Sequence, residues 1–413
     1  MQQVRTVIVI NDFDYITGGA GQIAINTANA LVERGLHVIF FSAVSDPARN
    51  DLSGGIERYS TDQKDILNNT NRLGAFTQGL WNQQSARLLR SILAKTDART
   101  TVIHLHTWIK ALSPSIGKVL AASDIPVVCT LHDYFTGCPN GGFYNFQQEK
   151  VCHLRAMSFS CICTNCDVRN YGHKLWRVAR QKVQLHLGKI PKEIRHFIAP
   201  TKLCEKILRP YLPASAAIHL LSNPVSRTLP GRPKADVSSD RFLFVGRLSK
   251  EKGVDIACAA AALVGARLTV IGSGPMEGML QEKYPQINFS GWLSPEKVSE
   301  EMLHARALLF PSVWYETQGL VVLEAFSVGL PVIVSDQCAA SEYVTPENGF
   351  IHTAGDIGDL AAKIKLLLTD AGRAETMSRH AHARYWERPL LRETHIDGAM
   401  AIYEQMLNEK DPI

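Results

Sequence analysis

Short, unbroken runs of apolar residues alternate with helix-length amphipathic stretches along the whole chain. In the first half, we predict strands at 6–10, 37–42, 101–105, 127–131 and 218–222, and in the second half at 242–245, 268–271, 307–310 and 332–335. Most of these runs are continuous Val, Ile and Leu, which is typical of parallel strands buried on both faces. The pattern predicts an α/β chain with two doubly wound parallel sheets.

The segment SNPVSRTLPGRPKADVSSD, residues 222–240, is rich in Pro, Ser and Gly and has no periodic apolar face. Such a stretch is typical of a link between domains. We therefore divide the chain into a Rossmann-like domain at 1–225, a second at 226–390 and a helical segment at 391–413.

Composition fits two globular domains, since the chain has 413 residues, 46% hydrophobic and 20% charged. The net charge of +5 does not by itself indicate a nucleic-acid-binding protein, but it suits anionic small molecules or an acidic membrane surface.

The first apolar run, Val7–Ile10, is too short for a signal peptide. No apolar run reaches the roughly 18 residues of a membrane span. We expect a cytoplasmic protein whose nine cysteines are mostly reduced.

Two carboxylates, Glu316 and Glu324, have seven residues between them in the stretch WYETQGLVVLEAFSVGLPVIVSD. Thr317 is a candidate N-cap for a helix predicted from about Gln318 to Val328. At about 1.5 Å of rise per residue, Glu324 then lies roughly 10 Å from the cap. Two solvated glutamates beside a core helix are the structural alternative.

The start of this helix is a candidate anion site. The backbone N–H groups of Gly319 and Leu320 fall in its first turn, where they have no partner within the helix. Amide donors with a carboxylate on either side suit a sugar, a diphosphate and a ribose.

Glycines and cations follow two other predicted strands of the second half. FVGRLSKEKG places Gly246, Arg247 and Lys252 after one strand, and VIGSGP places Gly272 and Gly274 after the next. Ligands of open α/β sheets bind beyond the carboxyl ends of the strands, where two cations can neutralise a diphosphate. Ordinary surface charges and an ordinary strand-to-helix turn are the alternatives.

In the first half, DFDYITGGAG carries Gly18 and Gly19 after the first strand. It resembles a phosphate loop but lacks the G-x-G-x-x-G spacing, and no acidic residue ends the second strand, which argues against NAD. His104, His106 and His132 lie at or just past strand ends, where a histidine can donate to a substrate or can be purely structural.

Five of the nine cysteines fall within 29 residues, in the stretch CPNGGFYNFQQEKVCHLRAMSFSCICTNC. In a reduced protein such clustering favours a metal site, here a structural zinc. Cys138 and Cys152 would be joined by either Cys163 with Cys166 or Cys161 with Cys166, and free thiols in a loop are the alternative.

A basic helix is predicted after the cysteines. Trp176, Ala179, Val183, Leu187 and Ile190 share one face of it, and lysines and arginines crowd the remainder. The helix could lie on an anionic membrane, or it could face the core with a solvated basic side.

Taken together, these residues resemble the retaining glycosyltransferases of family 4, which have the GT-B fold. The resemblance is carried by GRLSKEKG, VIGSGP, the E-x7-E pair Glu316 and Glu324, ENGF and, less strongly, GGAGQIAINTANALVERGLHV. The cysteine stretch, within an insertion at 133–172, departs from the basic family pattern. A similar insert in some relatives favours Cys161 over Cys163 as a ligand.

The resemblance implies two Rossmann-like domains that face each other across a cleft, with the terminal helix crossing back to the first. It implies a bacterial-type surface-polysaccharide enzyme that moves a sugar from a UDP- or GDP-sugar to a saccharide or lipid-linked acceptor, without a catalytic metal. The protein would act in the cytoplasm or at the inner face of the membrane, and no nucleic acid is expected as a partner.

The resemblance also implies roles for single residues. Arg247 and Lys252 would hold the diphosphate, Glu316 the sugar, and Glu324 the ribose. His132 would lie near the anomeric carbon. The remaining implied contacts are Gly18 and Gly19 for donor phosphate and acceptor, and Trp292 and Leu293 for the base.

Other readings stay open on sequence alone. A sugar-nucleotide epimerase or a phosphorylase of similar fold would also use a phosphate site. A zinc-dependent nucleic-acid-binding module would explain only the cysteines and the basic helix. A glycoside hydrolase also needs two carboxylates, but not the paired cations or the phosphate-ready helix start.

Overall fold

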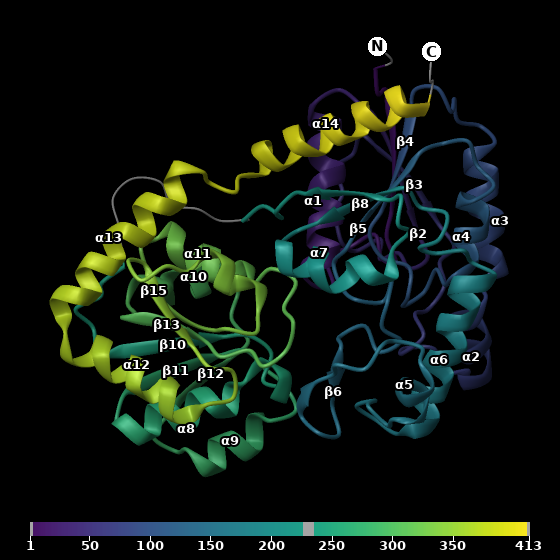
Figure 1. Ribbon diagram of the computed structural model, residues 1–413. Coiled ribbons are helices and arrows are strands. Elements are labelled where there is room, and N and C mark those ends of the chain that lie inside the picture. Colours follow the sequence, from purple (N-terminus) through teal and green to yellow (C-terminus); the bar gives the residue numbers. More distant parts are fainter. Residues whose placement is uncertain (1–2, 226–234, 411–413) are drawn as a thin grey trace. The chain divides into compact units, whose positions relative to one another are not determined.

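The computed structural model describes residues 3–225 and 235–410, and these form two compact units (Figure 1). The first unit comprises Met1–Gly142, His153–Pro224 and Arg392–Ile413, and the second comprises Phe143–Cys152 and Val225–Leu391. Each unit contains a parallel sheet with helices, which confirms the predicted α/β fold class. Residues 226–234 of the predicted linker lie outside the described residues.

The sheet of the first unit has seven parallel strands in the order β3-β2-β1-β4-β5-β8-β9. The strands are β1 (Thr6–Ile10), β2 (His37–Ser42), β3 (Ile56–Ser60), β4 (Thr101–Leu105), β5 (Val127–Thr130), β8 (His196–Ala199) and β9 (Ala217–Leu220). The helices are α1 (Gly19–Glu33), α2 (Arg72–Leu80), α3 (Gln83–Leu93), α4 (Ser115–Leu120), α5 (Phe159–Cys163), α6 (Tyr171–His186), α7 (Lys202–Leu208), η1 (Arg209–Tyr211) and α14 (Arg392–Lys410).

The sheet of the second unit has six parallel strands in the order β12-β11-β10-β13-β14-β15. The strands are β10 (Arg241–Val245), β11 (Arg267–Ile271), β12 (Asn288–Gly291), β13 (Ala307–Phe310), β14 (Val332–Ser335) and β15 (Gly349–His352). The helices are η2 (Lys250–Lys252), α8 (Val254–Val264), α9 (Glu277–Lys283), α10 (Pro295–Leu303), α11 (Leu320–Ser327), η3 (Ala339–Tyr343), α12 (Ile357–Thr369) and α13 (Ala371–Glu387).

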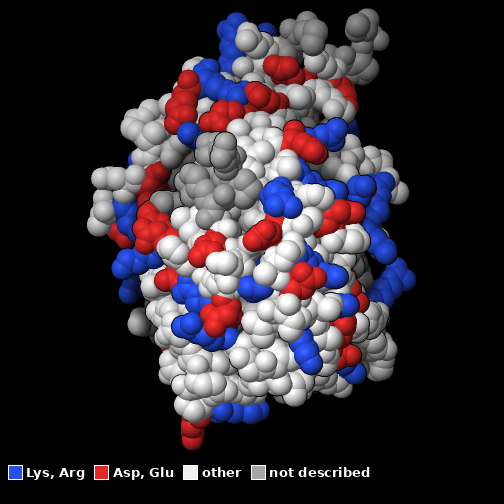
Figure 2. All heavy atoms as spheres, turned by 90° about the vertical axis from the view of Figure 1, so that its left-hand side faces the viewer, with Lys and Arg blue, Asp and Glu red and all other residues white. Residues whose placement is uncertain are grey.

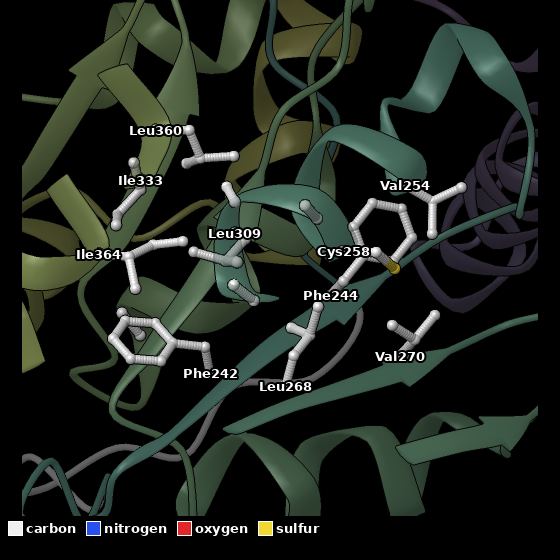
Figure 3. Close-up of a cluster of buried hydrophobic side chains, with 14 of the residues drawn as sticks. Phe242, Phe244, Val254, Cys258, Leu268, Val270, Leu309, Ile333, Leu360 and Ile364 are labelled. Carbon is white, nitrogen blue, oxygen red and sulfur yellow. The ribbon is translucent and has the colours of Figure 1, made fainter. Parts of the chain in front are cut away.

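Both faces of the second sheet are buried, which explains its unbroken apolar strands. Phe242 and Phe244 point to one face and pack with α8 and α12 (Figure 3), while Leu243 between them points to the other face and packs with α11 and α13. Because successive side chains of a strand alternate between faces, most positions are apolar when helices cover both faces.

The first unit is built from both ends of the chain. Val7 and Val9 of β1 share a core with α1, and Ile402, Tyr403 and Leu407 of α14 complete that core. Figure 1 shows α3 and α4 on the opposite side of this sheet from α1. The predicted terminal helix is therefore an integral part of the first unit.

One segment belongs to a different unit from the one predicted. The antiparallel hairpin β6 (Tyr144–Asn145) and β7 (Lys150–Val151) lies in the predicted insertion of the first domain, yet Phe143–Cys152 is part of the second unit. There Glu149 forms an ion pair with Lys250, at 3.1 Å.

The buried face of the basic helix is not the apolar face that the core-facing alternative would bury. The buried residues of α6 are Lys174, Val178, Arg180, Gln181 and Gln184. The polar members of this face have buried partners, because Gln184 accepts a hydrogen bond from the Trp108 indole and Arg180 donates to a backbone carbonyl. Ala179 and Leu187, predicted to face the core, are exposed, and Ile190 lies beyond the helix.

Candidate active site

The carboxyl edge of the second sheet carries most of the predicted site residues. Gly246 follows β10, Gly272 follows β11, and Gly291 ends β12. The N–H of Gly246 donates to Ile271 O at 3.0 Å, and that of Gly272 donates to Gly291 O at 2.8 Å. Gly272 has φ +132°, and a Cβ there would lie 1.9 Å from the oxygen of Gly246. Only glycine therefore lets these strand ends approach so closely.

An ion pair joins two predicted residues that are 64 positions apart. Lys252, at the end of η2, pairs its ammonium with the carboxylate of Glu316, which lies in the loop after β13. Glu316 is 9% exposed and also accepts a hydrogen bond from Ser312 Oγ at 3.2 Å. The Lys252 ammonium lies 5.1 Å from the centre of the Trp314 ring. The cation is thus held between a carboxylate and an aromatic face.

Backbone hydrogen bonds hold the two loops of this ion pair together. The carbonyl of Glu251 accepts from the Val313 N–H at 2.9 Å and from Ser312 Oγ at 3.2 Å. Arg247, earlier in the same loop as Glu251, is exposed. Ser312 and Trp314 were not predicted as site residues, because nothing in the sequence shows that their loop meets the η2 loop.

The helix between the two glutamates begins later than predicted. Gly319 is the N-cap of α11, with φ +82° and no side-chain cap hydrogen bond, and Leu320 is the first helical residue. The prediction of Thr317 as the cap was wrong, because the left-handed conformation that opens the helix requires the glycine. The first-turn amides still provide donors. Glu324 lies within α11 and is partly buried.

Two residues are predicted to contact the nucleoside base, and they differ in exposure: Trp292 is exposed, whereas Leu293 is partly buried. Trp292 follows β12 and is 73% exposed. Leu293 is partly buried against the core of the second unit. The exposed Trp292 indole, next to the sheet edge, can stack on a nucleoside base, whereas Leu293 can contact a base mainly through its backbone.

In the first unit, Asp12 ties together the loops after β1 and β4. Its carboxylate accepts the backbone N–H groups of Lys110, Ala111 and Leu112 at 2.9–3.0 Å. Asp12 is buried, and burial raises its pKa above the ordinary value despite these bonds. Its position directly after the first strand is the sequence signal that could have identified it.

The predicted glycine loop opens α1. Gly18 is the N-cap, without a side-chain cap hydrogen bond, and Gly19 begins the helix. A Cβ at either glycine would meet nothing within 4 Å. The start of α1 is therefore open to a ligand.

The three candidate histidines lie together in the first unit. His104 has both ring nitrogens bonded at 2.6 Å, Nδ1 to the Tyr403 hydroxyl and Nε2 to the Thr130 hydroxyl, and so fits the structural alternative. His106 Nδ1 lies 2.8 Å from His132 Nε2. Burial lowers the pKa of His104 and His106 well below the ordinary value, and that of His132 to about 3. All three rings are therefore neutral near pH 7.

The prediction of a zinc site is not confirmed by the structure. Across residues 3–225 and 235–410, no group of three or more His, Cys, Asp or Glu side chains could hold a metal ion. The ammonium of buried Lys174 lies 3.2 Å from Cys166 Sγ and 3.6 Å from Cys161 Sγ. Cys163 is exposed, and Cys138 is buried. All nine cysteines lie in the described part of the chain, and none of them forms a disulfide there.

Two family models match adjacent parts of the sequence. The model described as Glycosyltransferase Family 4 matches residues 17–229, and the one described as Glycosyl transferases group 1 matches residues 227–384. The chain belongs to glycosyltransferase family 4. The predicted resemblance is thus confirmed, and this family 4 protein is a glycosyltransferase.

Sequence relatives and solved structures are similar to this chain over nearly its whole length. The glycogen synthase of Mycobacterium tuberculosis (strain ATCC 25618 / H37Rv) is 24% identical over 395 residues, which cover 89% of this glycosyltransferase and 87% of the relative. The sucrose-phosphate synthase structure from Thermosynechococcus elongatus is similar with a TM-score of 0.73 and 20% identity, covering 98% of this chain and 100% of that one.

A second similar structure is Alr3699/HepE of Anabaena in complex with UDP and glucose. Its TM-score is 0.66 at 16% identity, and the match covers 97% of this glycosyltransferase and 100% of that chain. At such identities the structural likeness concerns the fold, which is GT-B.

Proposed function

We propose that the protein is a retaining glycosyltransferase that moves a sugar from a UDP- or GDP-sugar to a saccharide or lipid-linked acceptor, in surface-polysaccharide synthesis. The ion pair of Lys252 and Glu316, at the carboxyl edge of the second sheet, carries the proposal. A nucleoside diphosphate sugar offers both a phosphate for the ammonium and hydroxyls for the carboxylate. The UDP and glucose in the Anabaena structure support this donor class.

The leaving diphosphate needs positive charge, because its negative charge grows as the sugar departs. Arg247, Lys252 and the first-turn amides of α11 would supply it. When phosphate takes the Lys252 ammonium, the Glu316 carboxylate becomes available to a sugar hydroxyl. Each charge-assisted hydrogen bond contributes about 1.5–3 kcal/mol, roughly one to two decades in rate. These groups can carry the charge without a divalent metal in catalysis.

The nucleoside and the acceptor would use the remaining residues. Glu324 would bind the ribose hydroxyls, and the exposed Trp292 with the Leu293 backbone would meet the base. In the first unit, His132 would act on the transferred sugar. The open start of α1, at Gly18 and Gly19, would receive donor phosphate and acceptor.

Two substitutions test the diphosphate assignment. Arg247→Ala and Lys252→Ala should each lower sugar transfer by ten- to a hundredfold and weaken UDP or GDP binding, while thermal unfolding stays unchanged. Arg267→Ala is the matched control, because Arg267 is exposed at the amino end of β11, the opposite edge of the same sheet. Full transfer activity in both site variants would reject the assignment.

We also propose that a surface on α5 and α6 contacts anionic membrane, where a lipid-linked acceptor would lie. Phe159, Val168 and Leu175 are 82%, 59% and 44% exposed. Exposed Arg155, Arg169, Lys182 and Lys192 surround them along the chain, while Asp167, the one acid between 150 and 192, is buried. Apolar residues flanked by cations suit the surface of an anionic bilayer. No helix within the described ranges is long and apolar enough to span one.

Structural zinc on the cysteines stays a prediction. The two sulfurs beside Lys174 are the part of the cluster that the structure brings together. Metal analysis of the purified protein tests the predicted zinc, and less than one zinc ion per two chains would reject it.

A further inference from the structure

Three histidines of the first unit lie together near the carboxyl ends of β4 and β5. The ring centres of His104 and His106 lie 4.0 Å apart, and those of His106 and His132 lie 5.1 Å apart with planes 18° from parallel. His104 and His106 are 1% and 2% exposed. Hydrogen bonds at both nitrogens hold the His104 ring in one orientation, and the His106 ring packs against it.

His106 and His132 are joined by a hydrogen bond between imidazoles, from Nδ1 of one to Nε2 of the other at 2.8 Å. Both rings are neutral near pH 7, since burial lowers the pKa of each. Such a bond contains one proton, so one of these nitrogens donates and the other accepts. The direction of the bond therefore sets the tautomer of both rings.

The second nitrogen of His106 indicates that direction. His106 Nε2 is buried and has no hydrogen-bond partner among the residues that the structure describes. An unpaired buried N–H is rarer in proteins than an unpaired buried acceptor. We therefore assign the His106 proton to Nδ1, which makes His106 the donor and His132 Nε2 the acceptor. His132 then carries its own proton on Nδ1.

We propose that His106 is a positioning residue that holds His132 in one orientation and in the Nδ1-protonated form. What His132 then does rests on the proposed function. A ring with N–H at Nδ1 and its Nε2 occupied can donate a hydrogen bond to the sugar but cannot act as a general base through Nε2. In metal and catalytic sites, too, the hydrogen bond that one imidazole nitrogen makes with a neighbouring group fixes which of the two ring nitrogens carries the proton.

Three substitutions of His106 separate positioning from simple packing. Asn carries its amide near the place of Nδ1, Gln carries its amide near Nε2, and Leu has neither. His106→Asn should keep kcat within about threefold, while His106→Gln and His106→Leu should lose tenfold or more in kcat with the donor KM changed by less than about twofold. Equal losses in all three, or full kcat in the Leu variant, would overturn the proposal.

The tautomer is measured directly by ¹⁵N NMR of histidine-labelled protein, with the His132 signals identified by their loss in His132→Gln. We expect a protonated Nδ1 and a bare, hydrogen-bonded Nε2 in the unsubstituted protein, and a mixture of tautomers in His106→Leu. A proton on Nε2, or a mixture in the unsubstituted protein, would overturn the proposal. The NMR result stands whether or not any nucleotide sugar is a substrate, so it fails separately from the proposed function.

Discussion

At the scale of single residues, the site depends on polar groups that are buried and fully engaged. Asp12 accepts three backbone amides, Glu316 accepts from Lys252 and Ser312, and His104 is bonded at both nitrogens. A buried polar group that loses its partner costs about 1–3 kcal/mol. These residues therefore keep their loops in one arrangement.

His104 gives a prediction for pH dependence. Burial, with smaller contributions from His132 and His395, keeps its pKa well below the ordinary value of 6.5 in the folded protein. Below pH 6.5 the unfolded chain takes up a proton that the folded chain does not, so the free energy of unfolding falls as pH falls. For this one group the loss is at most about 1.4 kcal/mol for each pH unit below 6.5.

His104→Gln removes that titration. The variant should be less stable than the parent at pH 7, because the Tyr403 and Thr130 hydroxyls lose their ring partner. Its free energy of unfolding should nevertheless fall less between pH 7 and pH 5 than that of the parent, by up to about 2 kcal/mol. Urea unfolding at the two pH values measures both quantities. An unchanged difference between them would show that His104 is protonated in the folded protein.

At the scale of elements, α6 reverses the usual arrangement of an amphipathic helix. Its polar residues face inward because nearby loops and cysteine sulfurs present partners for them: Gln181 donates to carbonyls of the loop after β5, and Lys174 donates to two sulfurs. Leu175 and Leu187 are left exposed as a result. Because exposed leucines lie beside basic residues on this helix, α6 is the element whose membrane binding we test.

The double variant Phe159→Ser, Leu175→Ser tests that surface. The unsubstituted protein should bind vesicles that contain anionic lipid more strongly than neutral vesicles, and the variant should bind them about tenfold less, since it loses two apolar side chains from the contact. Leu263→Ser is the matched control, because Leu263 is 67% exposed on α8 of the second unit. Equal flotation of all three proteins with anionic vesicles would refute the proposed surface.

At the scale of the whole molecule, sequence order and structural unit do not coincide. The last helix completes the core of the first unit, and the hairpin at Phe143–Cys152 belongs to the second. Charges are mixed on the face shown in Figure 2, where lysines and arginines alternate with aspartates and glutamates. Among the described residues on that face, no basic cluster extends without acidic neighbours.

Leu407→Ala tests the dependence of the first unit on the end of the chain. Leu407 is fully buried in the core shared with α1, so its truncation should cost about 2–5 kcal/mol. Gln405→Ala, on the exposed side of α14, should change stability by less than about 0.5 kcal/mol.

Hydrogen exchange shows which unit is affected. Amides of β1 should exchange faster in Leu407→Ala, and those of β10 should not, because the second unit has its own core. Equal acceleration in both strands would show that the two units unfold together.

Continuous apolar runs determined most of the strands, because a strand covered on both faces buries nearly every side chain, and a polar one there needs buried partners, as His104 of β4 has. The runs at 6–10, 37–42, 101–105, 307–310 and 332–335 match β1, β2, β4, β13 and β14. The edge strands β3, β12 and β15 were missed, since edge positions tolerate polar residues, and β8, which begins with His196, was missed as well.

The family, and the loops that carry its residues, could also be read from the sequence, since glycines and charges at strand ends are local signals. Only the tertiary structure decided which distant groups meet. Lys252 with Glu316, Asp12 with the loop after β4, and His106 with His132 are contacts between different strand ends, and no local pattern records them. The structure also decided the burial of Lys174, because a cation is buried only where the fold supplies it with partners.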